Sequence, residues 1–173
     1  MKFSINVPKP SVYGFFELYV IGPKGDRYNE LVTTEEIEFN PDELIVDLTN
    51  RAVLEKELNT ITSKLYRFEY LHGRAKNLLD SLLHEESIYN DQRYQSIPTT
   101  PPPGKKEWTD TAKKAYLQAT ALDDPKIVKL WTYIGKSKVD VHDLSICITA
   151  LKSHLFKCRD FYNAILGASK PKE

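Results

Sequence analysis

The chain has 173 residues, 41% of them apolar and 28% charged, which is enough apolar material for a hydrophobic core. This length fits one domain, or one domain with a small appended module. The 24 basic and 24 acidic side chains give a net charge of zero, which taken alone argues against a nucleic-acid partner. No apolar run approaches the roughly 18–20 residues that a membrane-spanning helix needs, so no membrane association is expected.

The amino terminus and the cysteines indicate a reducing compartment. Residues 1–5 lead into Asn6 and two prolines rather than into an apolar stretch, so we expect no secretory signal. Cys147 and Cys158 lie eleven residues apart on one predicted helix, about 16 Å by helical rise, which is too far for a disulfide. A cytoplasmic location follows as the expectation.

Charge is distributed unevenly along the chain. Residues 1–50 carry 4 basic and 9 acidic side chains, a net charge of −5, and residues 51–103 carry 7 of each kind. Residues 104–173 carry 13 basic and 8 acidic side chains, a net charge of +5. One interpretation is that two surfaces of opposite charge have different roles. The other is that solvated faces simply differ between segments.

Residues 1–39 predict a small β-rich module. Residues 2–7 alternate polar and apolar side chains, and residues 12–21 are rich in aromatic and branched ones. A cluster of turn-forming residues at 22–26 separates this segment from a further candidate strand at 28–33. So small a sheet is marginal alone and requires a helix or a partner to cover it.

A first long helix is predicted over residues 40–94. Asn40 can cap it, Pro41 suits the first helical position, and Asp42 and Glu43 favour the positive end. Nine positions spaced alternately by four and three residues form an apolar stripe, the first seam, which is typical of helices packed lengthwise on one another. The first seam consists of Leu54, Leu58, Ile61, Leu65, Phe68, His72, Ala75, Leu79 and Leu82.

The helical pattern is interrupted at residues 95–107, where four prolines fall within six residues. We interpret this segment as an extended linker, with a docking site for another protein as the alternative. Residues 108–167 then predict a short helix capped near Thr109, followed by a long closing helix. Asp124 is the predicted cap of the closing helix and Pro125 its first residue.

The closing helix carries a second seam with the same three- and four-residue spacing. Gly167 and Pro171 mark its end, before a tail at residues 168–173. Two such helices predict a mainly α fold, a long antiparallel hairpin with the small β-rich module, and the apolar residues left uncovered predict self-association. We assign Leu144, Ile148, Leu151, Leu155, Tyr162 and Ile165 to the core or the oligomer contact. The whole second seam is Ile127, Leu130, Ile134, Ser137, Val141, Leu144, Ile148, Leu151, Leu155, Cys158, Tyr162 and Ile165.

No constellation of catalytic or metal-binding residues is apparent in the sequence. The four histidines, at positions 72, 84, 142 and 154, lack a ligand-like pattern of neighbours. The glycines at 22 and 25 lack the Gly-Lys-Ser/Thr ending of a phosphate loop, and there is no Gly-x-Ser-x-Gly elbow. We therefore predict a protein that is not an enzyme and takes no cofactor or metal.

Basic residues interleaved with aromatic ones are the remaining candidate chemistry. Tyr66, Phe68 and Tyr70 lie among basic residues on the first long helix, where Arg74 and Lys76 are about 200° apart and flank the seam. Such side chains suit single-stranded nucleic acid, because cations bind phosphates and rings stack on bases, although an ordinary solvated face has a similar composition. The candidate nucleic-acid-binding residues are Arg74, Lys76, Lys64, Arg67, Lys105 and Lys106.

Several short motifs occur in a characteristic order. They are Arg74-Ala75-Lys76 on the seam helix, Arg93-Tyr94 after an acidic stretch, Leu122-Asp123-Asp124-Pro125 at a helix break, and the stretch from Leu151 to Arg159 on the closing helix. In these features the chain from about Leu54 to Gly167 resembles the recombination mediators of T4-type phages, the UvsY family. The β-rich head and the proline run depart from that pattern.

The resemblance implies a non-catalytic, helical protein that forms ring-shaped oligomers, heptamers in the type case. It implies binding to single-stranded DNA, with Arg74 and Lys76 matching the DNA-contacting basic pair. It also implies help in loading a RecA-like recombinase where a single-strand-binding protein sits. We therefore predict a recombination mediator for phage homologous recombination and repair, in the host cell cytoplasm.

Two questions stay open at this point. The alternative function is a non-catalytic coiled-coil adaptor, a structural or assembly protein that does not bind nucleic acid. The acidic head has two candidate roles, namely contact with the recombinase or competition with DNA for the basic tail.

Overall fold

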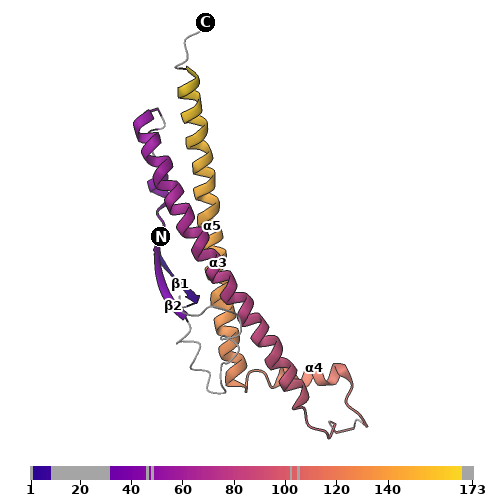
Figure 1. The fold of residues 1–173 in the computed structure, drawn as a ribbon. Helices are drawn as coiled ribbons and strands as arrows, with labels where there is room; N and C mark the ends of the chain where they lie inside the picture. Colours follow the sequence, from indigo (N-terminus) through magenta and orange to yellow (C-terminus); the bar gives the residue numbers. More distant parts are fainter. Residues whose placement is uncertain are drawn as a thin grey trace. The chain divides into compact units, whose positions relative to one another are not determined.

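The computed structural model describes residues 2–8, 32–45, 47, 49–101, 103–104 and 106–168. Over these residues the chain is mostly helical, with three α-helices and a two-stranded antiparallel sheet (Figure 1). The predicted mainly α fold with a small β-rich module is confirmed. None of the described helices combines the length and apolarity that a membrane crossing requires. The elements are β1 (Lys2–Pro8), β2 (Val32–Glu38), the 3-10 helix η1 (Pro41–Leu44), α3 (Arg51–Gln95), α4 (Asp110–Ala119) and α5 (Pro125–Ala168).

The chain divides into two compact units. α3 and α5 each contribute to both units, so the boundaries fall within helices rather than in the proline-rich segment predicted as a linker. Each unit buries its own apolar cluster, which is the physical reason for the division. Unit 1 comprises Met1–Val7, Thr34–Lys76 and Val139–Glu173, and unit 2 comprises Pro8–Thr33 and Asn77–Lys138.

The strands match the sequence prediction only in part. β1 confirms the strand predicted at residues 2–7. β2 overlaps the candidate strand at 28–33 in its first two residues and continues to Glu38, because Val32, Thr33, Thr34 and Ile37 are β-branched and suit a pleated surface in spite of the three glutamates of the strand. The first four residues of that candidate lie outside the described residues. The predicted strand at 12–21 and the turn at 22–26 lie outside the described residues.

The first long helix begins at Arg51, eleven residues later than predicted. Asn40 does act as a cap, since its Oδ1 accepts the Asp42 N–H at 3.1 Å, but the helix that it starts is η1, which has four residues. Asn50 caps α3 instead, with its Oδ1 accepting the backbone N–H of Ala52 at 3.0 Å. The cap signal at residue 40 was correct, whereas the length of the helix that follows was not.

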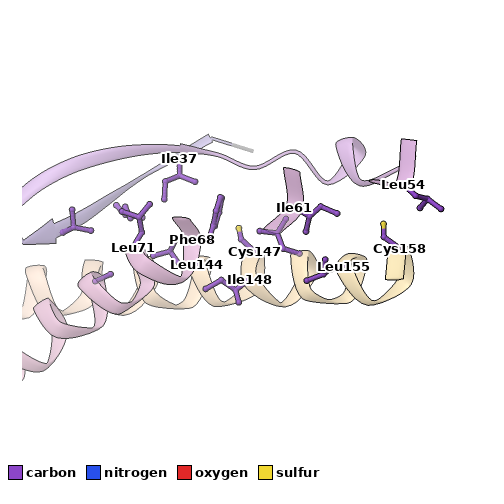
Figure 2. Packing of buried hydrophobic residues seen from close by; sticks show 14 residues of the cluster. Ile37, Leu54, Ile61, Phe68, Leu71, Leu144, Cys147, Ile148, Leu155 and Cys158 are labelled. Atoms are coloured by element: carbon purple, nitrogen blue, oxygen red, sulfur yellow. The ribbon is translucent and has the colours of Figure 1, made fainter. Parts of the chain in front are cut away.

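In unit 1 the two seams face each other along antiparallel helices. Figure 2 shows Leu54 and Cys158 at one end of the cluster and Leu71 and Leu144 towards the other. The predicted seam residues Leu144, Ile148, Leu151 and Leu155 are buried in this core, and Tyr162 and Ile165 pack against it partly buried. The hairpin therefore closes within one chain.

The small sheet packs on the same core, which gives it the cover that so few strands require. Ile5, Val7 and Ile37 are buried in the unit 1 cluster. The backbone N–H of Asn6 donates a buried hydrogen bond of 2.9 Å to a carboxylate oxygen of Asp140 on α5. This bond ties β1 to the closing helix.

Unit 2 has a separate core formed by α3, α5 and the turn between α4 and α5. Both predicted caps are confirmed there. The Thr109 hydroxyl accepts the Ala112 N–H at 3.2 Å, and Asp124 Oδ1 accepts the Lys126 N–H at 3.0 Å, so that α5 begins at Pro125. The buried members of this core are Leu78, Leu82, Ala121, Ile127, Leu130 and Ile134.

Candidate nucleic-acid interface

An aromatic and basic surface lies on α3 in unit 1, and we call it the tyrosine face. It consists of Tyr66, Arg67 and Tyr70. The two tyrosines are one helical turn apart and are 75% and 62% exposed, and Arg67, which follows Tyr66 in the sequence, is exposed as well. Phe68, the third aromatic residue of the prediction, is buried in the core and offers no stacking surface.

Arg74 borders the tyrosine face and is held by the fold. Its guanidinium carbon lies 5.6 Å from the centre of the Tyr70 ring, and its Nη1 lies 3.4 Å from Oε1 of Glu35 on β2. Its Nη2 is buried and has no hydrogen-bond partner among the described residues. A phosphate that reached this guanidinium would have to compete with the Glu35 carboxylate, so the predicted DNA contact at Arg74 is masked in this conformation.

The other predicted basic residues of α3 lie on different faces of the helix. Lys64 is about 200° from Tyr66 and its Nζ is 2.7 Å from the Glu43 carboxylate. Lys76 is exposed on the opposite flank of the seam from Arg74, as predicted, and it forms no ion pair with any described residue. The structure therefore brings Arg67 and Arg74 to the tyrosines, and it does not bring Lys64 or Lys76 there.

The remaining two candidates belong to the segment before α4. Lys106 is exposed and is part of unit 2. Lys105 lies outside the described residues.

Two carboxylates from the acidic first 50 residues form ion pairs with basic residues of α3. Glu35 pairs with Arg74 and Glu43 pairs with Lys64, whereas Glu38 pairs with Lys2 inside the sheet at 3.6 Å. From the sequence, the acidic head was predicted, as one of two candidate roles, to compete with DNA for the basic tail. In unit 1 the carboxylates lie instead on two of the predicted DNA contacts of the first long helix.

Removing these two carboxylates is expected to raise affinity for single-stranded DNA. In the Glu35→Gln, Glu43→Gln variant, both cations become available to phosphates, with a gain of up to about thirty-fold at low salt, since surface ion pairs are worth about 0.2–1 kcal/mol each. The measurement is fluorescence anisotropy of a labelled oligo-dT. Glu38→Gln, a carboxylate of the same sheet with no partner on α3, is the matched control. Unchanged affinity in a folded double variant would show that these pairs do not mask DNA contacts.

A polar cluster in unit 2 joins two motifs that the sequence showed only as separate signals. Arg93 Nε lies 3.2 Å from Asp124 Oδ2, and its Nη2 donates to the carbonyl oxygen of Leu117 at 2.9 Å. The Tyr89 hydroxyl also donates to Asp124, at 3.0 Å. Because Asp124 caps α5, these contacts fix the junction of α3, α4 and α5. Arg93 and Asp124 therefore have a structural role that accounts for their place in the ordered motifs.

The buried thiols have the environment of core residues. Burial raises the pKa of both Cys147 and Cys158, and the nearby carboxylates of Asp143 and Glu57 respectively raise it further. Cys158 Sγ lies 3.5 Å from Nε2 of His154, which is on the preceding turn of α5. A neutral, buried thiol is a poor nucleophile, which supports the core interpretation made from the sequence. Among the described residues, no group of three or more His, Cys, Asp or Glu is arranged to hold a metal ion.

No family model, no curated protein and no solved structure matches this chain. The likeness to the UvsY family therefore stays a prediction.

Proposed function

We propose that this protein binds single-stranded DNA and acts as a recombination mediator, helping a RecA-like recombinase to load where a single-strand-binding protein sits. The observation that carries the DNA-binding part is the tyrosine face. It offers two exposed rings, the exposed cation of Arg67 beside them, and the Arg74 guanidinium against the second ring. Proteins that bind single strands without sequence preference use this combination of stacking platforms and cations.

The spacing of the rings favours a single strand over a duplex. Tyr66 and Tyr70 are about 6 Å apart along the helix axis, since each residue rises about 1.5 Å. Stacked bases in a duplex strand are about 3.4 Å apart. Both rings can therefore stack on bases of one strand only where that strand is extended and unstacked. A paired, stacked duplex does not offer such bases.

Binding by this surface is expected to depend on salt to a moderate degree. If Arg67 and Arg74 each contact one phosphate, two counterions are displaced. The logarithm of the association constant should then fall linearly with the logarithm of salt concentration, with a slope of about −1.4 per protomer for this surface. The measurement is an anisotropy titration of labelled oligo-dT over a range of salt, with mass determined in parallel by light scattering. Absent or salt-insensitive binding would refute the proposal.

Self-association is part of the same proposal. Val139, Ile146 and Phe161 are exposed apolar side chains on the part of α5 that belongs to unit 1. Val139 and Ile146 are seven residues apart, the heptad distance of helices that pack lengthwise. A second copy of the chain would cover them, and a ring of copies, in which this stripe meets a different surface of the next copy, is the arrangement that the UvsY resemblance implies. A monomeric mass at all concentrations would refute the proposed self-association but not the proposed DNA binding.

The same apolar stripe favours the second candidate function, a coiled-coil adaptor. Such a protein would assemble but would not prefer DNA. The parallel titration separates the two candidates, because an adaptor gives an oligomeric mass without any shift in oligo-dT anisotropy. Light scattering alone does not distinguish them.

A further inference from the structure

A surface cavity of about 390 Å³ lies in unit 2. The end of α3, the following residues and the start of α4 line it, and Figure 1 shows the course of the chain there. This volume falls in the range of about 300–1,000 Å³ that is typical of small-molecule sites. The rings of Tyr94 and Trp108 and the ammonium of Lys113 line it, together with the polar side chains of Gln95 and Thr99.

The walls of the cavity are held in place from several sides. Trp108 Nε1 donates to the carbonyl oxygen of Thr100 at 3.2 Å. The Trp108 ring also packs edge-on against the Tyr116 ring of α4, with 5.5 Å between the ring centres. The Tyr94 hydroxyl donates to Asp110 at 3.0 Å. Because the rings are fixed before any ligand arrives, little conformational entropy is lost when one binds.

The charge of the lining distinguishes this cavity from two others in unit 1. Those have acidic and basic side chains together, Glu36, Glu38 and Lys2 in one case and Glu69 and Lys152 in the other. The cavity at Trp108 is lined by Lys113 and, among the described residues, by no acidic side chain. It therefore suits a ligand that is flat and aromatic and carries negative charge.

We infer that this cavity takes one unpaired base of a single-stranded nucleic acid. Lys113 Nζ already lies 4.8 Å from the centre of the Tyr94 ring, which leaves the Trp108 ring as the stacking platform. Gln95 and Thr99 provide donors and acceptors for the edge of the base. The adjacent phosphates meet Lys113 and the exposed Lys106 and Lys114. This inference rests on the proposed function and assigns to it a second contact, in unit 2.

The test compares two labelled strands of equal length, oligo-dT and an abasic strand that has the same phosphates but no bases. Trp108→Ala should lower affinity for oligo-dT by about five-fold to about 150-fold, the effect of removing one stacking platform. It should leave affinity for the abasic strand unchanged. Trp108→Phe, which retains a ring, should keep most of the oligo-dT affinity even if alanine disturbs the loop.

A direct readout comes from the fluorescence of Trp108. The chain has two tryptophans, so in a Trp131→Phe background Trp108 is the only one, and oligo-dT should quench its emission while the abasic strand should not. Equal oligo-dT affinity in wild type and Trp108→Ala, without quenching, would overturn the inference while DNA binding itself stands. Failure of the wild-type protein to bind either strand would overturn the proposed function as well.

Discussion

Replacing both Tyr66 and Tyr70 by alanine is expected to lower affinity for oligo-dT by at least about thirty-fold. Base–aromatic stacking is worth about 1–3 kcal/mol per base, and both rings are open to solvent, so their removal takes away two platforms. The fold should be unaffected, because neither ring belongs to the core. Fluorescence anisotropy gives the affinity, and far-ultraviolet circular dichroism checks that the helices persist.

The matched control for the tyrosine variant is Phe156→Ala. Phe156 lies on α5, is exposed to the same extent as Tyr70, and is followed by the exposed Lys157. If the tyrosine face carries the binding, this control keeps its affinity for oligo-dT. The reverse result would be a large loss of oligo-dT affinity with Phe156→Ala and none with the tyrosine variant. It would show that DNA binds to α5 and would contradict the assignment of DNA binding to the tyrosine face.

Leu151→Ala is expected to lower the free energy of unfolding by about 2–5 kcal/mol. Leu151 is almost fully buried between α3 and α5, and truncating such a side chain loses its transfer free energy and leaves a cavity. Urea denaturation followed by circular dichroism measures the change. Leu122→Ala, at a position 77% exposed, should stay within about 0.5 kcal/mol of the wild type.

The same denaturation experiment tests where the hairpin closes. The core of unit 1 forms within one chain, so the wild-type midpoint should not move when the protein concentration is changed over the range below any self-association. A midpoint that rises steeply with concentration throughout would show that the seams pack between chains instead. A Leu151→Ala loss below about 1 kcal/mol would show that Leu151 does not lie in a packed core.

Much of the helical core could be predicted from the sequence because its determinants are local. The spacing of the seams placed Leu54, Ile61, Leu144 and Leu151 in the core, and the structure buries all four. The caps at Thr109 and Asp124 were equally readable, since a cap acts on residues two or three positions away. These signals need no knowledge of the rest of the chain.

The candidate site was less predictable because its decisive contacts are not local. Arg74 meets Glu35 across 39 residues of sequence, and nothing in the basic-x-basic motif indicates that a strand covers one of its members. Arg93 and Asp124, which are 31 residues apart in the sequence, form an ion pair although they belong to two separate sequence motifs. The exposure of Tyr66 and Tyr70, by contrast, follows from their position opposite the seam, and Phe68 could have been excluded on the same grounds.

The hydrogen bond from Asn6 to Asp140 has a consequence for how the small sheet meets other chains. A strand at the edge of a sheet normally presents unpaired backbone groups, and these can recruit a further strand and start aggregation. At Asn6 the outward N–H of β1 is already satisfied by a helix carboxylate. Another strand cannot add in register there without displacing that carboxylate. One acidic side chain on α5 thereby protects this edge of a two-stranded sheet against edge-to-edge growth.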